Sequence, residues 1–187
     1  MNAFAKIDKA AFLRMVDRYR GPLMELVKGR VVQQMTGGSR DHGLVARRVV
    51  QLMLTQVDEN VWTVLPDRGV DTPETIRYPD VVIEPADEPG KSRITSRPAL
   101  IVEVLSPSTI VTDLDVNPAE YMALPSLDAY VIASQDEPAM LVFERAPDGT
   151  FPAEPREVSG AENEVVIICR GFSITLRLSS IYQGLLG

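Results

Sequence analysis

The stretch from Tyr78 to Ser106, YPDVVIEPADEPGKSRITSRPALIVEVLS, contains two short apolar runs joined by a polar loop. The second run, residues 99–105, is apolar on both faces, which is typical of a central strand that is covered on each side. Glu103 lies inside this run. An ionised carboxylate in dry surroundings costs several kcal/mol unless it is paired or binds a metal. The sequence therefore marks Glu103 as a candidate functional residue.

A second carboxylate, Asp80, opens the neighbouring apolar run at residues 81–83. Two carboxylates on adjacent strands form an oxygen-rich pocket that suits a hard cation such as Mg²⁺. The residues alone leave two interpretations open. One is a metal site formed by Asp80 and Glu103, and the other is a buried acid at Glu103 that a local arginine neutralises.

These residues carry a resemblance to a known superfamily. Pro-Asp at residues 79–80, then 22 residues, then Glu-Val-Leu at 103–105 resembles the PD-(D/E)xK restriction-endonuclease-like superfamily. The continuation EVLSPST is similar to the Uma branch of putative restriction endonucleases, and the likeness runs from about Phe12 to the C-terminus. The resemblance implies an α/β fold with a central mixed β-sheet flanked by helices. It implies a single restriction-endonuclease-like domain over residues 1–187.

The resemblance also implies an activity, which is Mg²⁺-dependent (or Mn²⁺-dependent) hydrolysis of DNA phosphodiester bonds. Asp80 and Glu103 would be catalytic residues and metal ligands, and the backbone carbonyl of Val104 would be a third metal ligand. Glu25 corresponds to a glutamate of the family pattern and would face the same pocket as an outer metal or water ligand. From the residues alone, Glu25 is equally consistent with a solvent-facing position on an edge strand. Many superfamily members dimerise to cut both strands, so a homodimer is expected.

One departure from the family pattern concerns the positive charge of the site. The superfamily usually has a lysine two residues after the glutamate, where this chain has Leu105. In the Uma branch the lysine commonly lies in the next helix, and the corresponding position here is Asn117. Loss of a preorganised electrostatic donor costs about 10²–10³ in rate. The alternative function is therefore a catalytically impaired nuclease fold that acts as a binding or regulatory module. The weak candidates for a replacement are Lys28, Arg30 and Lys91.

Several basic residues are candidate contacts to nucleic acid. The loop at residues 85–97 has the densest basic segment near the expected pocket, and phosphate attraction is one interpretation of it. An ordinary solvated loop is the other. The four candidate nucleic-acid contacts are Arg47, Lys91, Arg93 and Arg97. His42, at the start of a predicted helix, is a candidate general base or phosphate contact, or else a residue that packs or bonds locally.

Bulk composition narrows the class of protein. The chain has 187 residues, with 19 basic and 26 acidic residues and a net charge of −7. That balance argues against a broad, sequence-indifferent nucleic-acid surface but leaves room for a local basic groove.

The single cysteine, Cys169, follows an apolar run and is predicted to be an inert buried thiol. No apolar run approaches the roughly 20 residues of a membrane span. No signal peptide is recognisable, so a cytoplasmic protein without a membrane partner is expected.

The remaining patterns predict the order of helices and strands. Residues 8–20 and 42–57 have helical periodicity, and residues 23–35 have the pattern of a β-hairpin with its turn near Lys28. Asn117 and Pro118 are predicted to begin a short helix. Residues 70–77 have no long periodic run and predict at most a short edge strand, while residues 152–163 are predicted to be a loop. A short C-terminal helix is expected. Further strands are predicted at 61–65, 81–83, 99–105, 128–134, 140–145, 164–170 and 172–178.

Overall fold

The computed structural model describes residues 6–33, 38–105 and 117–185. Two mixed sheets and a separate two-stranded hairpin make up the β-structure of these residues. The larger sheet has six strands, in the spatial order β11 (Arg156–Ser159), β10 (Ala139–Glu144), β9 (Ala129–Ser134), β8 (Leu100–Leu105), β6 (Val81–Pro85) and β3 (Trp62–Pro66). Only the β8–β9 pair is parallel, so the sheet is mixed.

Strand β8 is the centre of this sheet, as its apolar sequence predicts. Every residue of β8 except Glu103 is buried. Alternate residues of the strand belong to two different cores, with Val102 and Val104 on one face and Ile101 and Leu105 on the other. Both faces are therefore covered, and Glu103 places a carboxylate on the face that carries the second core, where an unpaired charge is costly.

The five-stranded sheet was not expected from the sequence. Its strands lie in the order β2 (Arg30–Gln33), β1 (Met24–Val27), β5 (Thr75–Arg77), β4 (Gly69–Asp71) and β7 (Ile94–Thr95). The predicted hairpin is confirmed as β1–β2. The segment at 70–77, predicted as at most one short edge strand, instead supplies the two strands β4 and β5. The expectation of one central sheet is corrected to two mixed sheets.

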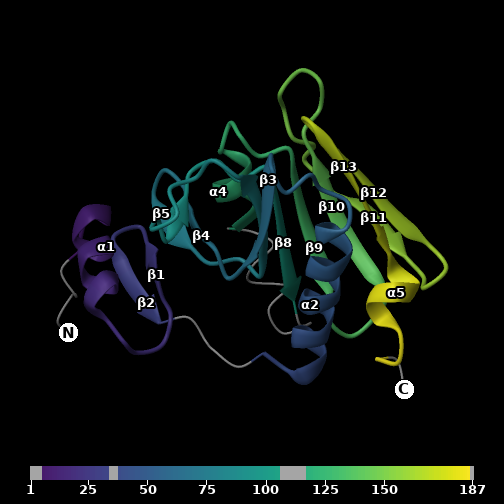
Figure 1. The fold of residues 1–187 in the computed structure, drawn as a ribbon, viewed down its shortest axis with the longest axis horizontal. Helices are drawn as coiled ribbons and strands as arrows, with labels where there is room; N and C mark the ends of the chain where they lie inside the picture. Colours follow the sequence, from purple (N-terminus) through teal and green to yellow (C-terminus); the bar gives the residue numbers. More distant parts are fainter. Residues whose placement is uncertain (1–5, 34–37, 106–116, 186–187) are drawn as a thin grey trace.

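Helix α2 (Arg40–Leu54) covers one face of the six-stranded sheet. Its buried residues Val45, Val49 and Met53 lie on one stripe, as the sequence pattern predicts. The same core contains the hairpin of β12 (Glu164–Cys169) and β13 (Phe172–Arg177) and the helix α5 (Leu178–Tyr182). Figure 1 shows this hairpin and α5 beside α2, at the opposite end of the molecule from the N-terminus. One face is thus covered by a helix and a hairpin rather than by helices alone.

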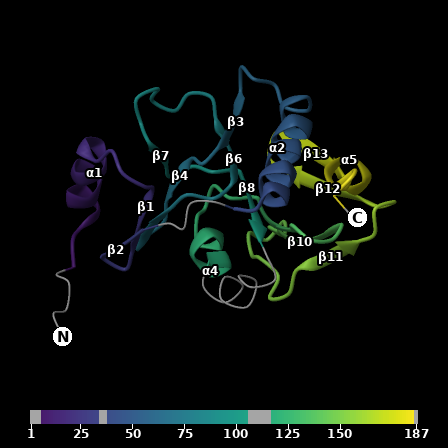
Figure 2. The same cartoon turned by 90° about the horizontal axis from the view of Figure 1, so that it is seen from below.

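The second face carries the short helix α4 (Asn117–Met122). Tyr121 of α4 is buried in a core with Ile101 and Tyr130, and Figure 2 shows α4 and α2 on opposite sides of β8. This placement matters for function because α4 lies on the face of β8 from which the Glu103 side chain projects.

The N-terminal helix α1 (Lys9–Arg18) begins after Asp8, whose side chain accepts a hydrogen bond from the Ala11 N–H. Phe12 and Val16 of α1 pack in a small core with β1 and β5. Residues 156–159, predicted as loop, form the edge strand β11 because they pair with β10. No helix among the described residues is long and apolar enough to span a membrane.

Candidate active site

The pairing of β6 with β8 brings the two predicted carboxylates to neighbouring positions. Val81 pairs with Val102 in this antiparallel register. Continuing the register by one residue places Asp80 opposite Glu103. The two acids, which are far apart in the sequence, therefore lie across from each other where β6 begins and β8 approaches its end.

The carboxylate of Asp80 is held by two donors. Its Oδ2 accepts a hydrogen bond of 2.7 Å from the backbone N–H of Val104. Its Oδ1 lies 3.3 Å from Nε2 of His42. His42 lies in the first turn of α2, where its N–H donates to the capping hydroxyl of Ser39. The start of α2 is thereby fixed against the strand end that carries Asp80.

Asp80 also changes the protonation of its neighbours. The hydrogen bond between His42 and Asp80 raises the pKa of His42. This bond, together with hydrogen bonding to the Val104 backbone, outweighs burial, which acts to lower that pKa. Burial raises the pKa of Asp67, and the negative charge of Asp80 raises it further. The contact with Asp80 thus favours the charged, imidazolium form of His42.

Glu103 is oriented from the other side of the sheet. The hydroxyl of Tyr121 donates a hydrogen bond of 3.1 Å to its Oε1. Burial raises the pKa of Tyr121 well above its ordinary value, and the charges of Glu103 and Glu25 act in the same direction. Tyr121 therefore stays protonated and acts as a donor, which suits an ionised carboxylate at Glu103.

Glu25 belongs to a second group of charges centred on Arg77. Nη1 of Arg77 donates to Glu25 Oε2 across 3.1 Å, and Nε donates to Glu120 Oε2 across 3.2 Å. Burial would lower the pKa of Arg77, but the two carboxylates outweigh it and raise that pKa. Oε1 of Glu25 accepts from the backbone N–H of Tyr78, just before Pro79 and Asp80. Glu25 is thus a largely buried residue of an inner strand, with 14% of its side chain exposed, and not a solvent-facing edge residue.

The donor set at Asp80 and Glu103 fits a magnesium ion bound through one or two carboxylates, a mode in which the ion keeps several waters. Among residues 6–33, 38–105 and 117–185, no group of three or more His, Cys, Asp or Glu side chains could hold a metal ion. A fully protein-ligated cage is therefore not formed by the described part of the chain. The carbonyl-ligand role of Val104 stays a prediction. Its N–H is already committed to Asp80.

The predicted nucleic-acid contacts lie in different surroundings. Arg97 pairs with Asp87 and Glu88. Arg93 pairs with Asp17. Arg47 and Lys91 are exposed. Two of the four predicted contacts, Arg93 and Arg97, are thus already paired with carboxylates. This pairing reduces the positive charge that these two arginines can offer a phosphate.

Three residues of the site were missed by the sequence analysis, namely Arg77, Glu120 and Tyr121. Arg77 immediately precedes the Tyr-Pro-Asp segment, and its proximity to Asp80 could have drawn attention to it. Glu120 and Tyr121 lie in the predicted short helix, but only the fold shows that this helix faces Glu103. The helix at 117–122 is confirmed. The Ser-Pro-Ser-Thr continuation after the Glu103 strand lies outside the described residues.

Comparison with known proteins identifies the family of the chain. The family model Uma2, described as "Putative restriction endonuclease", matches residues 10–179. The chain belongs to the Uma2 family. The match spans both sheets, the Asp80–Glu103 pair and the charges around Arg77.

Individual relatives extend the comparison. An uncharacterized protein of Synechocystis sp. is 28% identical over 153 residues, which cover 79% of this chain and 79% of that protein. The crystal structure of a putative nuclease belonging to DUF820 from Anabaena variabilis is similar in fold, with a TM-score of 0.72. The match covers 92% of this chain and 97% of the Anabaena chain. At 13% sequence identity, the second likeness concerns the fold alone.

Proposed function

We propose that this Uma2 protein is a Mg²⁺-dependent endonuclease that hydrolyses DNA phosphodiester bonds. The observation that carries the proposal is the opposed pair of acids, with Asp80 directly before β6 and Glu103 on the strand β8 that is hydrogen-bonded to it. The family description, "Putative restriction endonuclease", supports it, and so does the likeness in fold to the Anabaena protein, which is described as a putative nuclease.

Asp80 and Glu103 would hold the metal ion, with the Val104 carbonyl as a third ligand. When bound, the metal would polarise a phosphoryl oxygen and lower the pKa of the attacking water. The protein's own contribution is orientation. The Val104 N–H fixes one carboxylate and the Tyr121 hydroxyl fixes the other. Carboxylates held in this way lose little freedom when a ligand binds.

Two further residues would act around this pair. His42 would neutralise Asp80 in the resting protein, because its imidazole lies on Oδ1. Arg77 would hold Glu25 near the site and supply the positive charge that Asn117 cannot. Stabilising the developing negative charge of a phosphoryl transition state is the task for which a fixed cation is most useful.

A second candidate function is a binding module with impaired catalysis. The observation that favours it is the charge distribution. No lysine or arginine occurs between Arg97 and Arg145, and the nearby cation Arg77 is already bonded to two carboxylates. A metal-binding protein that holds nucleic acid without cutting it would have this appearance.

Cleavage of supercoiled plasmid by the purified protein tests the first candidate. The reaction is run in Mg²⁺ and separately in Mn²⁺, with Glu103→Gln as the test variant. Glu164→Gln is the matched control, because Glu164 lies on the exposed side of β12. We expect nicking by the wild type and the control that is lost in Glu103→Gln and in chelator. Nicking that persists in Glu103→Gln would refute the proposal, and absence of cleavage with metal-dependent DNA binding would favour the second candidate.

A further inference from the structure

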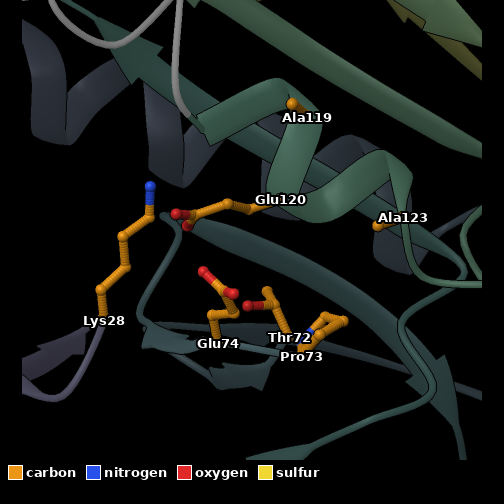
Figure 3. Close-up of a pocket in the computed structure, with 7 residues that line it drawn as sticks. All are labelled: Lys28, Thr72, Pro73, Glu74, Ala119, Glu120 and Ala123. Carbon is orange, nitrogen blue, oxygen red and sulfur yellow. The ribbon is translucent and has the colours of Figure 1, made fainter.

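A groove beside the candidate site has no role in the chemistry described so far. It lies between the β1–β2 turn, the turn at residues 72–74 and the outer side of α4, and its volume is about 410 Å³. Small-molecule sites typically measure about 300–1,000 Å³. Figure 3 shows the side chains of Lys28, Glu74 and Glu120 converging on this space from three different elements. The groove therefore has the size and the polar groups of a ligand site.

Lys28 occupies a backbone position that its residue type disfavours. Lys28 and Gly29 form the two-residue turn between β1 and β2, with φ angles of 49° and 82°. Such turns need positive φ at both positions and strongly prefer asparagine, aspartate or glycine at the first. A lysine there is strained, and Figure 3 shows its side chain at the groove. Within the described part of the chain, no salt bridge engages the Lys28 ammonium.

Glu120 has one oxygen in use and one without a partner. Oε2 accepts from the Thr75 hydroxyl and from Arg77. Oε1 is buried and has no hydrogen-bond partner among the described residues. A buried carboxylate oxygen in this state is costly, and a ligand that donates to it would remove the cost. Glu74 adds a second acceptor on the opposite wall.

The groove walls are otherwise mainly apolar. Pro73, Ala119 and Ala123 line them together with Thr72, whose hydroxyl is already hydrogen-bonded to Thr75. Small apolar side chains offer flat surfaces to a planar group, and the polar groups gather at one end of the groove (Figure 3). A planar ligand with a polar edge fits this division better than a compact ion does.

We propose that this groove binds a guanine base of the nucleic-acid substrate. The edge of guanine carries two adjacent donors, N1–H and the N2 amino group, followed by the O6 acceptor. Carboxylate oxygens of Glu74 and Glu120 accept from the donors, and the Lys28 ammonium donates to O6. Adenine and cytosine offer one donor group each, and thymine offers a single N–H between two acceptors. Of the four bases, guanine alone matches two carboxylates and one ammonium.

This inference rests on the proposed function in one respect, because it assigns the base to a nucleic acid that the candidate site cuts. The bound base would come from a single strand or be extruded from a duplex, which costs a few kcal/mol. A base bound in the groove would be linked to the candidate site through Glu120. The Glu120 carboxylate is hydrogen-bonded to Arg77, and Arg77 is hydrogen-bonded to Glu25. Because Tyr121, the residue after Glu120, is hydrogen-bonded to Glu103, we expect a base bound at Glu120 to bring the adjacent phosphodiester toward the candidate site.

The test is isothermal titration of guanosine 5′-monophosphate into the full chain in the presence of chelator. Parallel titrations use the adenosine, cytidine and uridine monophosphates, guanosine without phosphate, and inorganic phosphate alone. We expect binding of the two guanine compounds, and weaker or no binding of the others. Equal affinity for all four nucleotides, or binding of phosphate as tight as that of guanosine monophosphate, would overturn the proposal. So would the absence of any guanosine binding.

Variants locate the binding. Lys28→Asn and Glu74→Gln should each weaken guanosine binding by about tenfold or more, the effect of losing one charge-assisted hydrogen bond. Lys28→Asn should also raise the melting temperature, because asparagine suits the turn. Lys6→Asn and Glu59→Gln are matched controls. Lys6 packs beside the same turn without lining the groove, and Glu59 is exposed after α2. Unchanged binding in both groove variants would refute the assignment.

Plasmid cleavage separates this inference from the proposed function. Cleavage without guanosine binding would leave the nuclease and remove the guanine groove. Guanosine binding that depends on Lys28 and Glu74, without cleavage, would support the groove and contradict the nuclease.

Discussion

The hydroxyl of Tyr121 donates a hydrogen bond of 3.1 Å to the carboxylate of Glu103, from a helix that covers the sheet to the strand at its centre. Tyr121→Phe removes this donor without changing the shape of the side chain. We expect the free energy of unfolding to fall by about 1.5–3 kcal/mol, since the bond is made to a charged group. Urea denaturation followed by circular dichroism measures the change.

The same substitution should reduce metal-dependent cleavage, because Glu103 loses a group that orients it. Tyr19→Phe is the control, as Tyr19 lies at the exposed end of α1. A Tyr121→Phe protein with wild-type stability and wild-type cleavage would show that the hydrogen bond contributes nothing.

Arg77 holds two carboxylates that would otherwise repel each other in a largely buried position. Its side chain is 14% exposed, and Arg77→Ala would leave Glu25 and Glu120 without their shared cation. Breaking a buried ion pair by removing one partner typically costs about 3–5 kcal/mol. We expect a loss of that order in the free energy of unfolding, with partial recovery when Glu120→Gln is added.

The comparison variant for Arg77 is Arg156→Ala. Arg156 pairs with Glu144 with 45% of its side chain exposed, and such exposed pairs contribute about 0–1 kcal/mol. If both arginine variants lost the same small amount of stability, the buried charge group would have no structural importance.

The contact of His42 with Asp80 predicts a pH dependence of stability. The folded pKa of His42 is raised above its ordinary value of 6.5, chiefly by Asp80. The stability from this contact is therefore fully present below the unfolded pKa and is lost as pH rises through the folded pKa. In chelator, His42→Asn should lower the melting temperature at about pH 5.5 and change it little at about pH 8.5. An equal effect at both pH values would mean that the charge of His42 does not matter.

Cys169 should be unreactive in the folded protein. Burial raises the pKa of its thiol to about 12, and the charge of Asp128 acts in the same direction. Because the thiolate is the reactive form, a disulfide reagent at neutral pH should modify this thiol only after the addition of denaturant. Rapid stoichiometric labelling of the native protein would contradict the buried position.

The elements that sequence analysis predicted well have strong local patterns. Helix α2 has a stripe of buried residues at helical spacing and a serine cap, and the strand of Glu103 is apolar on both sides of that residue. The β1–β2 hairpin was found from its Lys-Gly turn. Each of these signals lies within a few consecutive residues, so no knowledge of the tertiary structure was needed.

The second sheet could not be predicted because its short strands lack such local patterns. Strands β4 and β5 have three residues each, too few to show a period, and they form because β1 and β7 lie on either side of them. Strand β11 forms by pairing with β10. Tertiary pairing decides such short segments, and their own sequence does not.

The candidate site divides in the same way. Asp80 and Glu103 were found because acids beside apolar strands are unusual, and the pairing of β6 with β8 confirms that their strands are neighbours. The charge group around Arg77 joins residues from β1, β5 and α4. Contacts between residues so far apart in the sequence depend on the fold, and nothing in the local pattern around Glu120 indicates them.

The most direct test of the account is titration of Mn²⁺ into chelator-treated protein, followed by calorimetry or by the paramagnetic signal of free Mn²⁺. The account predicts a site in the wild type that is lost or greatly weakened in Asp80→Asn and in Glu103→Gln, while Glu164→Gln binds as the wild type does. Equal Mn²⁺ binding by all four proteins, or no binding by the wild type, would contradict a metal site formed by Asp80 and Glu103.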